Sequence, residues 1–196
     1  MGRIGRLVLA GLLGGIAMYI WSSLAHTVLP LGEVGMREIP NEAPALAALH
    51  TAIGDKNGMY YFPGMGLGDH ATGAQKSAGM KAYLPKLAAN PSGLLIYHAP
   101  GAKGMTTSQL VHEALLELAE ALILAFLLAQ TVIVGLVGRT LFAGGVGLAV
   151  AITTNGSYHI WYGFPCDYTL ANVTIQLVGY LVAGVVIALT MGKRAA

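Results

Sequence analysis

The chain has 196 residues, of which 55% are hydrophobic and only 10% are charged, and its formal net charge is +2. Soluble domains carry about 25% charged residues, so this composition excludes a disordered chain and a nucleic-acid-binding protein. Glycine contributes 27 residues without a collagen repeat. The apolar, charge-poor and glycine-rich composition therefore predicts an all-α integral membrane protein.

The first predicted transmembrane helix covers residues 7–29, since about 20 apolar residues cross a bilayer core about 30 Å thick. Arg3 and Arg6 precede it, and Tyr19 and Trp21 lie toward its far end, where aromatic side chains favour the membrane interface. The small residues that follow also resemble a signal-peptide cleavage site. Because the aromatic residues suit an anchored segment, we expect a retained helix.

The long connection 30–108 is predicted to be a largely irregular loop outside the membrane. Within it, residues 42–50 are predicted to form a short helix and residues 94–98 a short strand. Such a segment buries too little apolar area to fold alone, so we expect it to pack on the helix ends or on a partner. Its methionines and histidines are suitable copper(I) ligands, but their irregular spacing favours a packing role.

The second predicted transmembrane helix, residues 110–137, carries three glutamates. Glu113, Glu117 and Glu120 follow the spacing i, i+4, i+7, which places them on one helix face within roughly 60°. Carboxylates are costly inside a membrane, by roughly 2.5–3.5 kcal/mol for Asp on insertion scales, so they usually face a bundle interior or water. The spacing therefore predicts a polar stripe that faces other helices.

The third predicted helix, residues 141–164, is separated from the second only by residues 138–140, which requires a tight helical hairpin. Its middle contains the small and polar run 153–157, which is expected to weaken the helix. Its polar side chains are Asn155, Tyr158, His159 and Tyr162, and three of them repeat the i, i+4, i+7 spacing.

The fourth predicted helix covers residues 170–191, with Asp167 at its mouth. Tyr168, Asn172 and Gln176 are spaced four residues apart along its start. The predicted organisation is therefore a first helix in residues 1–29, an extracytoplasmic loop in 30–108 and three further helices in 109–196.

Basic residues predict the orientation of this four-helix arrangement. Arg3, Arg6, Arg139, Lys193 and Arg194 all fall on one side of it, without acidic neighbours. By the positive-inside rule that side is the cytoplasm, so both termini are expected inside and the long loop outside. The expected location is a cell membrane, specifically a bacterial inner membrane.

The polar side chains of the predicted helices lie at a similar depth. Glu117, Asn155 and Gln176 are each about eight residues, or roughly 12 Å, from the outer boundary. The inner halves of the helices are apolar. A polar cluster confined to the outer half disfavours a simple channel, which needs polar residues along its whole length.

Several uses of this cluster are open. A divalent cation would suit carboxylate and imidazole donors, and the candidate metal ligands are Glu113, Glu117, Glu120, His26 and His159. The supporting polar residues are Asn155, Tyr158, Tyr162, Asp167, Asn172 and Gln176. The same groups would suit a proton relay, an amine or lipid headgroup, or hydrogen bonds between helices. A haem with two histidine ligands needs two imidazoles that face each other at the same depth, and His26 with His159 is the one candidate pair. Haem is therefore disfavoured, and no cofactor is assigned.

Three function classes follow from these observations. The leading hypothesis is an accessory or assembly subunit of a larger membrane complex, because the chain is small, lacks catalytic motifs and carries close-packing glycines such as Gly11 and Gly15. Its expected partners are membrane lipid and either other subunits or a second copy. The alternative is a cation- or proton-binding transport protein that uses the glutamate and histidine cluster. A membrane metalloenzyme acting on a lipid or quinone is the third class.

Overall fold

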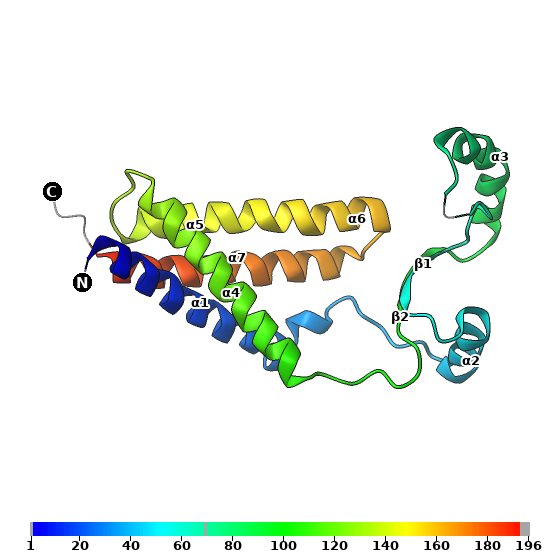
Figure 1. The fold of residues 1–196 in the computed structure, drawn as a ribbon, viewed down its shortest axis with the longest axis horizontal. Helices are drawn as coiled ribbons and strands as arrows, with labels where there is room; N and C mark the ends of the chain where they lie inside the picture. The colour runs from blue at the N-terminus through cyan, green and yellow to red at the C-terminus, as the bar shows by residue number, and fades with distance from the viewer. Residues whose placement is uncertain (1, 69, 193–196) are drawn as a thin grey trace. The chain divides into compact units, whose positions relative to one another are not determined.

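The computed structural model describes residues 2–68 and 70–192 of the chain (Figure 1). The described chain is mostly helical. It divides into two compact units, one formed by residues 1–37 and 104–196 and the other by Glu38–Lys103. The first unit contains the apolar helices, and we call it the helical bundle.

The bundle contains four long helical segments, one of which changes its helix type along its length. α1 is followed by one turn of 3-10 helix, and α5 continues through a π-helical turn, η2, into α6. The elements of the bundle are α1 Arg3–Thr27, η1 Leu31–Glu33, α4 Thr107–Ala129, α5 Leu136–Ala151, η2 Ile152–Gly156, α6 Ser157–Tyr162 and α7 Cys166–Met191.

Helix α7 packs against both α1 and α5, and α4 packs along α1 (Figure 1). Small residues allow these close approaches. A Cβ atom added to Gly15 would lie 2.7 Å from the Cα of Leu118 in α4, and one added to Gly147 would lie 2.5 Å from the Cβ of Tyr180 in α7. The glycines therefore serve contacts within the bundle. Its buried core is rich in alanine and leucine and comprises Ala10, Met18, Ala121, Leu124, Ala125, Leu128, Ala143, Tyr180, Ala183 and Ile187.

Within the described residues, three helices are long and apolar enough to cross a membrane. They are Arg3–Thr27, the joined segment Leu136–Tyr162 and Cys166–Met191. This composition is compatible with a multi-pass membrane protein. Helix α4 is not in this set, because its three glutamates lie within a helix of only 23 residues.

The predicted boundary between the second and third helices is wrong by several residues. Helix α4 ends at Ala129 and α5 begins at Leu136, so the turn lies before the expected position. Gly135 has a φ of 83°, a left-handed conformation that glycine adopts without strain. The hydropathy of residues 132–134 concealed this turn, because these residues are as apolar as the helices on either side.

Arg139 consequently lies inside the first turns of α5 and not in a connecting loop. It is only 4% exposed. Its guanidinium donates hydrogen bonds to the carbonyl oxygens of Ala188, at 3.4 Å, and Gly192, at 2.7 Å, where α7 ends. Arg139 thus ties the start of α5 to the end of α7. The predicted basic residues Lys193 and Arg194 lie outside the described residues.

The second unit has more regular structure than the irregular loop that we predicted. It contains α2 Glu42–Ile53, β1 Gly58–Phe62, α3 Gly73–Ala89 and β2 Gly93–Tyr97. The two strands are antiparallel, with Gly58 opposite Tyr97 and Phe62 opposite Gly93. The short helix and short strand expected here are present as α2 and β2, whereas α3 was missed. Its sequence signal is the capping box formed by Thr72 and Gln75.

Candidate functional site

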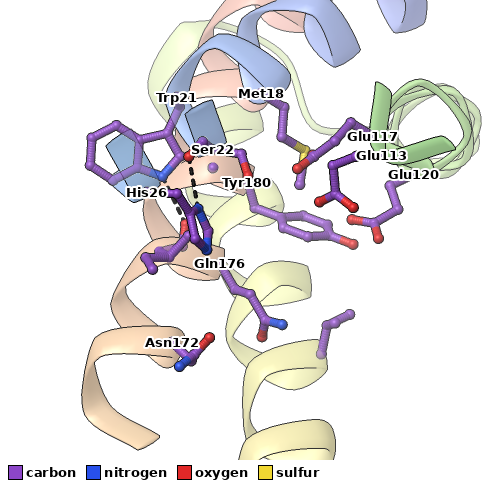
Figure 2. Close-up of a pocket in the computed structure, with 13 residues that line it drawn as sticks. Met18, Trp21, Ser22, His26, Glu113, Glu117, Glu120, Asn172, Gln176 and Tyr180 are labelled. Carbon is purple, nitrogen blue, oxygen red and sulfur yellow. Dashed lines mark hydrogen bonds between the residues drawn. The ribbon is translucent and has the colours of Figure 1, made fainter. Parts of the chain in front are cut away.

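Helices α1, α4, α5 and α7 surround a cavity of about 240 Å³ inside the bundle (Figure 2). Its walls combine carboxyl and amide groups with aromatic and aliphatic side chains. The lining residues are Met18, Trp21, Ser22, His26, Glu113, Glu117, Glu120, Val150, Asn172, Ile175, Gln176, Gly179 and Tyr180. We call this cavity the acidic pocket.

The acidic wall of the pocket comes from α4. Glu113, Glu117 and Glu120 all line the pocket, and Figure 2 shows them projecting from α4 toward Met18 and Tyr180. The i, i+4, i+7 spacing produces this arrangement, because it keeps the three side chains on one face of an α-helix. Glu113 is exposed, Glu120 is half-buried and Glu117 is buried.

Glu117 is the most enclosed member of this wall, with 9% of its surface exposed. The side chain of Ser22 in α1 lies near its carboxyl group. The second oxygen, Oε2, is buried and has no hydrogen-bond partner among the described residues. The charged groups that act on Glu117 are Glu113 and Glu120, so its electrostatic surroundings are negative. A buried acceptor in this state is costly unless a ligand satisfies it.

The α1 wall supplies an aromatic side chain and an imidazole. The indole Nε1 of Trp21 donates a hydrogen bond to the carbonyl oxygen of Ile175 at 2.9 Å, which fixes the ring against α7. The Nδ1 atom of His26 lies 2.9 Å from the carbonyl oxygen of Ser22. Both rings are therefore positioned by backbone carbonyl groups.

The α7 wall supplies amide and phenol groups. The Tyr180 hydroxyl lies near the carboxyl group of Glu120 (Figure 2). Asn155 of the π-helical turn donates from Nδ2 to Oε1 of Gln176 at 3.0 Å. The side-chain amide of Asn172 donates to the carbonyl oxygen of Tyr168 at 3.0 Å. Asn155 does not line the pocket, but it holds Gln176, which does.

The remaining polar residues singled out by the sequence do not line this pocket. The Nδ1 atom of His159 lies 2.7 Å from the carbonyl oxygen of Phe164, where α6 ends. The rings of Tyr158 and Tyr162 contact each other at 5.8 Å between centroids. Asp167 accepts a hydrogen bond from the backbone of Tyr168 at the start of α7. These four side chains satisfy or cover the ends of α6 and α7.

Of the five proposed metal ligands, four line the pocket: His26 and the three glutamates. In residues 2–68 and 70–192, no three side chains among His, Cys, Asp and Glu are grouped as a metal site requires.

Sequence reasoning missed the apolar and aromatic side of the pocket, chiefly Trp21 and Tyr180. Tyr180 continues the four-residue spacing of Tyr168, Asn172 and Gln176, so its position was available as a signal. Trp21 was interpreted as an interfacial anchor. Its contact with α7 depends on helix packing, which a single sequence does not reveal.

No protein family, curated protein or solved structure matches this chain. The chemistry of the acidic pocket therefore carries the functional argument. Carboxylates beside electron-rich aromatic rings attract positive charge, since both the anions and the ring faces interact favourably with cations.

Proposed function

We propose that the chain crosses the membrane four times and that α4 is the fourth membrane-spanning helix. The side of α4 away from the pocket supports this, because its large apolar residues are exposed: Leu116 and Ile123 are each 59% exposed and Phe126 is 55% exposed. An apolar face of this kind is suited to lipid. The three glutamates face the pocket, where their cost in a membrane is reduced.

The proposed orientation places both termini in the cytoplasm of a bacterial cell and residues 30–108 outside its inner membrane. Arg3 and Arg6 begin α1, and Arg139 contacts the end of α7, so these basic residues share one end of the bundle (Figure 1). That end is the cytoplasmic one under the positive-inside rule. The acidic pocket then lies toward the outer half of the membrane.

The proposed function is the binding of a positively charged ligand in the acidic pocket, as part of a transport process and without catalysis. One observation carries it: Glu117 is buried, and its Oε2 atom lacks a partner among the described residues in a cavity that contains two more glutamates. Leaving a buried acceptor unsatisfied costs about 1–3 kcal/mol and more for a charged group. A bound cation would offset this cost.

The test is calorimetric titration of the full-length protein in phosphatidylcholine nanodiscs. Calcium chloride and n-butylammonium chloride serve as separate probes in an amine-free buffer. We expect saturable binding of at least one probe and a loss of at least tenfold in affinity for Glu117→Gln, because this change removes the enclosed charge and preserves the side-chain shape.

The matched control is Glu42→Gln, which makes the same change at an exposed position in α2. We expect this variant to bind as the wild type does. The proposed function is wrong if neither probe binds, or if both variants lose affinity equally.

A role as an accessory subunit is the second candidate, and an exposed apolar face in residues 38–103 favours it. Only Pro63 and Tyr97 are buried among the described residues of this unit. Met59 and Ile96 are opposite each other in the two-stranded sheet and are 65% and 63% exposed. A two-stranded sheet is marginally stable alone, so this face is suited to a protein partner.

This second candidate predicts that another chain remains bound in mild detergent and dissociates from the double variant Met59→Glu, Ile96→Glu. Blue-native electrophoresis followed by mass spectrometry measures both properties. A lone monomer in the wild type would count against the accessory role.

A further inference from the structure

We infer that the ligand of the acidic pocket is a primary ammonium group on an organic molecule, held by Glu117 and Tyr180 in a pocket that Trp21 also lines. This inference rests on the proposed cation-binding function and names its ligand class. The shared chemistry is an alkyl-NH₃⁺ group, carried by either a lipid headgroup or a free amine.

The size of the pocket is the first argument. A cavity measured in this way needs about 10–15 Å³ to hold one water molecule, so about 240 Å³ is far more than a single ion or water requires. Calcium requires 6–8 oxygen ligands at 2.3–2.6 Å. No compact group of three metal-binding side chains is present among the described residues. The cavity therefore fits a small organic group better than a single coordinated ion.

The composition of the walls is the second argument. Trp21, Tyr180 and Met18 line the pocket together with the glutamates (Figure 2). Trp and Tyr rings attract ammonium groups through their electron-rich faces, and Met and aliphatic side chains suit the attached carbon chain. A hydrated inorganic ion makes no favourable contact with this apolar surface. An organic cation uses both kinds of wall.

The hydrogen-bonding state of Glu117 is the third argument, and it selects a primary over a quaternary ammonium. Oε2 of Glu117 is a buried acceptor that needs a donor. A primary ammonium has three N–H donors, as the lysine side chain does, whereas a tetraalkylammonium has none. Glu113 is exposed and Glu120 is half-buried, so the buried Oε2 of Glu117 is the glutamate oxygen of this wall that most needs a donor.

The experiment compares n-butylammonium, tetramethylammonium and calcium, each added to the full chain in phosphatidylcholine nanodiscs. The protein carries Trp161→Phe, which leaves Trp21 as the single tryptophan of the chain. Trp161 is 79% exposed, so its replacement is expected to leave the pocket intact. Calorimetry measures affinity, and Trp21 fluorescence reports whether the probe enters the pocket.

We expect n-butylammonium to bind at least tenfold more tightly than tetramethylammonium and to change Trp21 fluorescence. Glu117→Gln is expected to weaken n-butylammonium at least tenfold. Tyr180→Phe, which keeps the ring, is expected to weaken it less. The inference is overturned if tetramethylammonium binds as tightly as n-butylammonium or more tightly. It is also overturned if the fluorescence of Trp21 does not change when n-butylammonium is added.

The probes also separate this inference from the proposed function. If calcium binds in a Glu117-dependent manner and n-butylammonium does not, the ammonium assignment is wrong and cation binding stands. If no probe binds, both proposals fail.

A final arm identifies the source of the ammonium group. Nanodiscs with 20 mol% phosphatidylethanolamine present it as a lipid headgroup. Competition by this lipid with n-butylammonium supports the ammonium assignment with a lipid source. Unchanged n-butylammonium binding supports the same assignment with a free amine as the source.

Discussion

At the scale of single residues, Glu117 links the stability of the bundle to its ligand. Because Oε2 is buried and has no partner among the described residues, the carboxylate does not stabilise the fold in the absence of a ligand. We expect the free energy of unfolding of Glu117→Gln to lie within about 1 kcal/mol of the wild-type value or above it, since this change removes a charge from an enclosed site. Thermal unfolding in detergent measures this. A loss well above this range would indicate that Glu117 is a structural hydrogen-bonding residue.

The Asn155–Gln176 pair is the clearest side-chain hydrogen bond between neighbouring helical segments. Its Nδ2–Oε1 distance is 3.0 Å, and Asn155 is 8% exposed. Such pairs in membrane proteins average about 0.6 kcal/mol and reach about 1.7 kcal/mol. We expect a double-mutant cycle of Asn155→Ala and Gln176→Leu to give a coupling energy in this range. A coupling energy of zero would show that the two side chains act independently.

The sequence placed the glutamates of α4 correctly on one wall, but it did not locate His159 relative to them. Spacing within a single α-helix determines which side chains share a face. Between Asn155 and His159, however, the chain passes from the π-helical turn into α6. A π turn has more residues than an α turn and so rotates the following side chains away from the expected phase. The face containing Asn155 therefore could not be extrapolated to His159.

At the scale of elements, close helix packing depends on glycine where two backbones meet. A Cβ at Gly15 would lie 2.7 Å from the Cα of Leu118. Because this Cα belongs to the backbone of α4, the clash can be relieved only by a shift of that helix. We expect Gly15→Ala to lower the free energy of unfolding by about 1–3 kcal/mol, as overpacking does.

The matched control for this prediction is Gly145→Ala in α5. A Cβ added to Gly145 would meet nothing within 4 Å. Alanine favours helix over glycine by up to about 1 kcal/mol, so this variant is expected to be as stable as the wild type or more so. Equal destabilisation of both variants would contradict a packing role specific to Gly15.

Helix existence was more predictable than helix boundaries. Long apolar runs predicted α1, α5 and α7, whereas the turn after Ala129 consists partly of apolar residues and leaves no hydropathy signal. The start of α4 has a local signal, since Thr106 and Gln109 form a capping box. Boundaries set by caps are therefore readable in this chain, and boundaries set by glycine dihedrals within apolar segments are not.

At the scale of the whole molecule, Arg139 connects two segments that are far apart in the sequence. Its guanidinium donates to the carbonyl oxygens of Ala188 and Gly192 at the end of α7, where the last carbonyl groups of a helix need donors from outside it. The Ala188 oxygen also accepts from the backbone N–H of Gly192. Basic charge at a helix C-terminus is also favourable. The sequence analysis placed Arg139 in a connection between two helices, whereas its burial follows from the three-dimensional arrangement of α5 and α7.

We therefore expect Arg139→Met to lower the free energy of unfolding by about 1–3 kcal/mol, because it removes the side-chain hydrogen bonds to the carbonyl oxygens of Ala188 and Gly192. Arg139→Lys keeps the charge but not the planar arrangement of donors, so an intermediate loss is expected. Arg3→Met, at an exposed position, is the matched control and is expected to unfold as the wild type does. Thermal unfolding of the four proteins in one detergent measures these differences. If Arg3→Met and Arg139→Met lower the free energy of unfolding equally, the loss is due to a general effect of charge. The contact between Arg139 and α7 would then not be its cause.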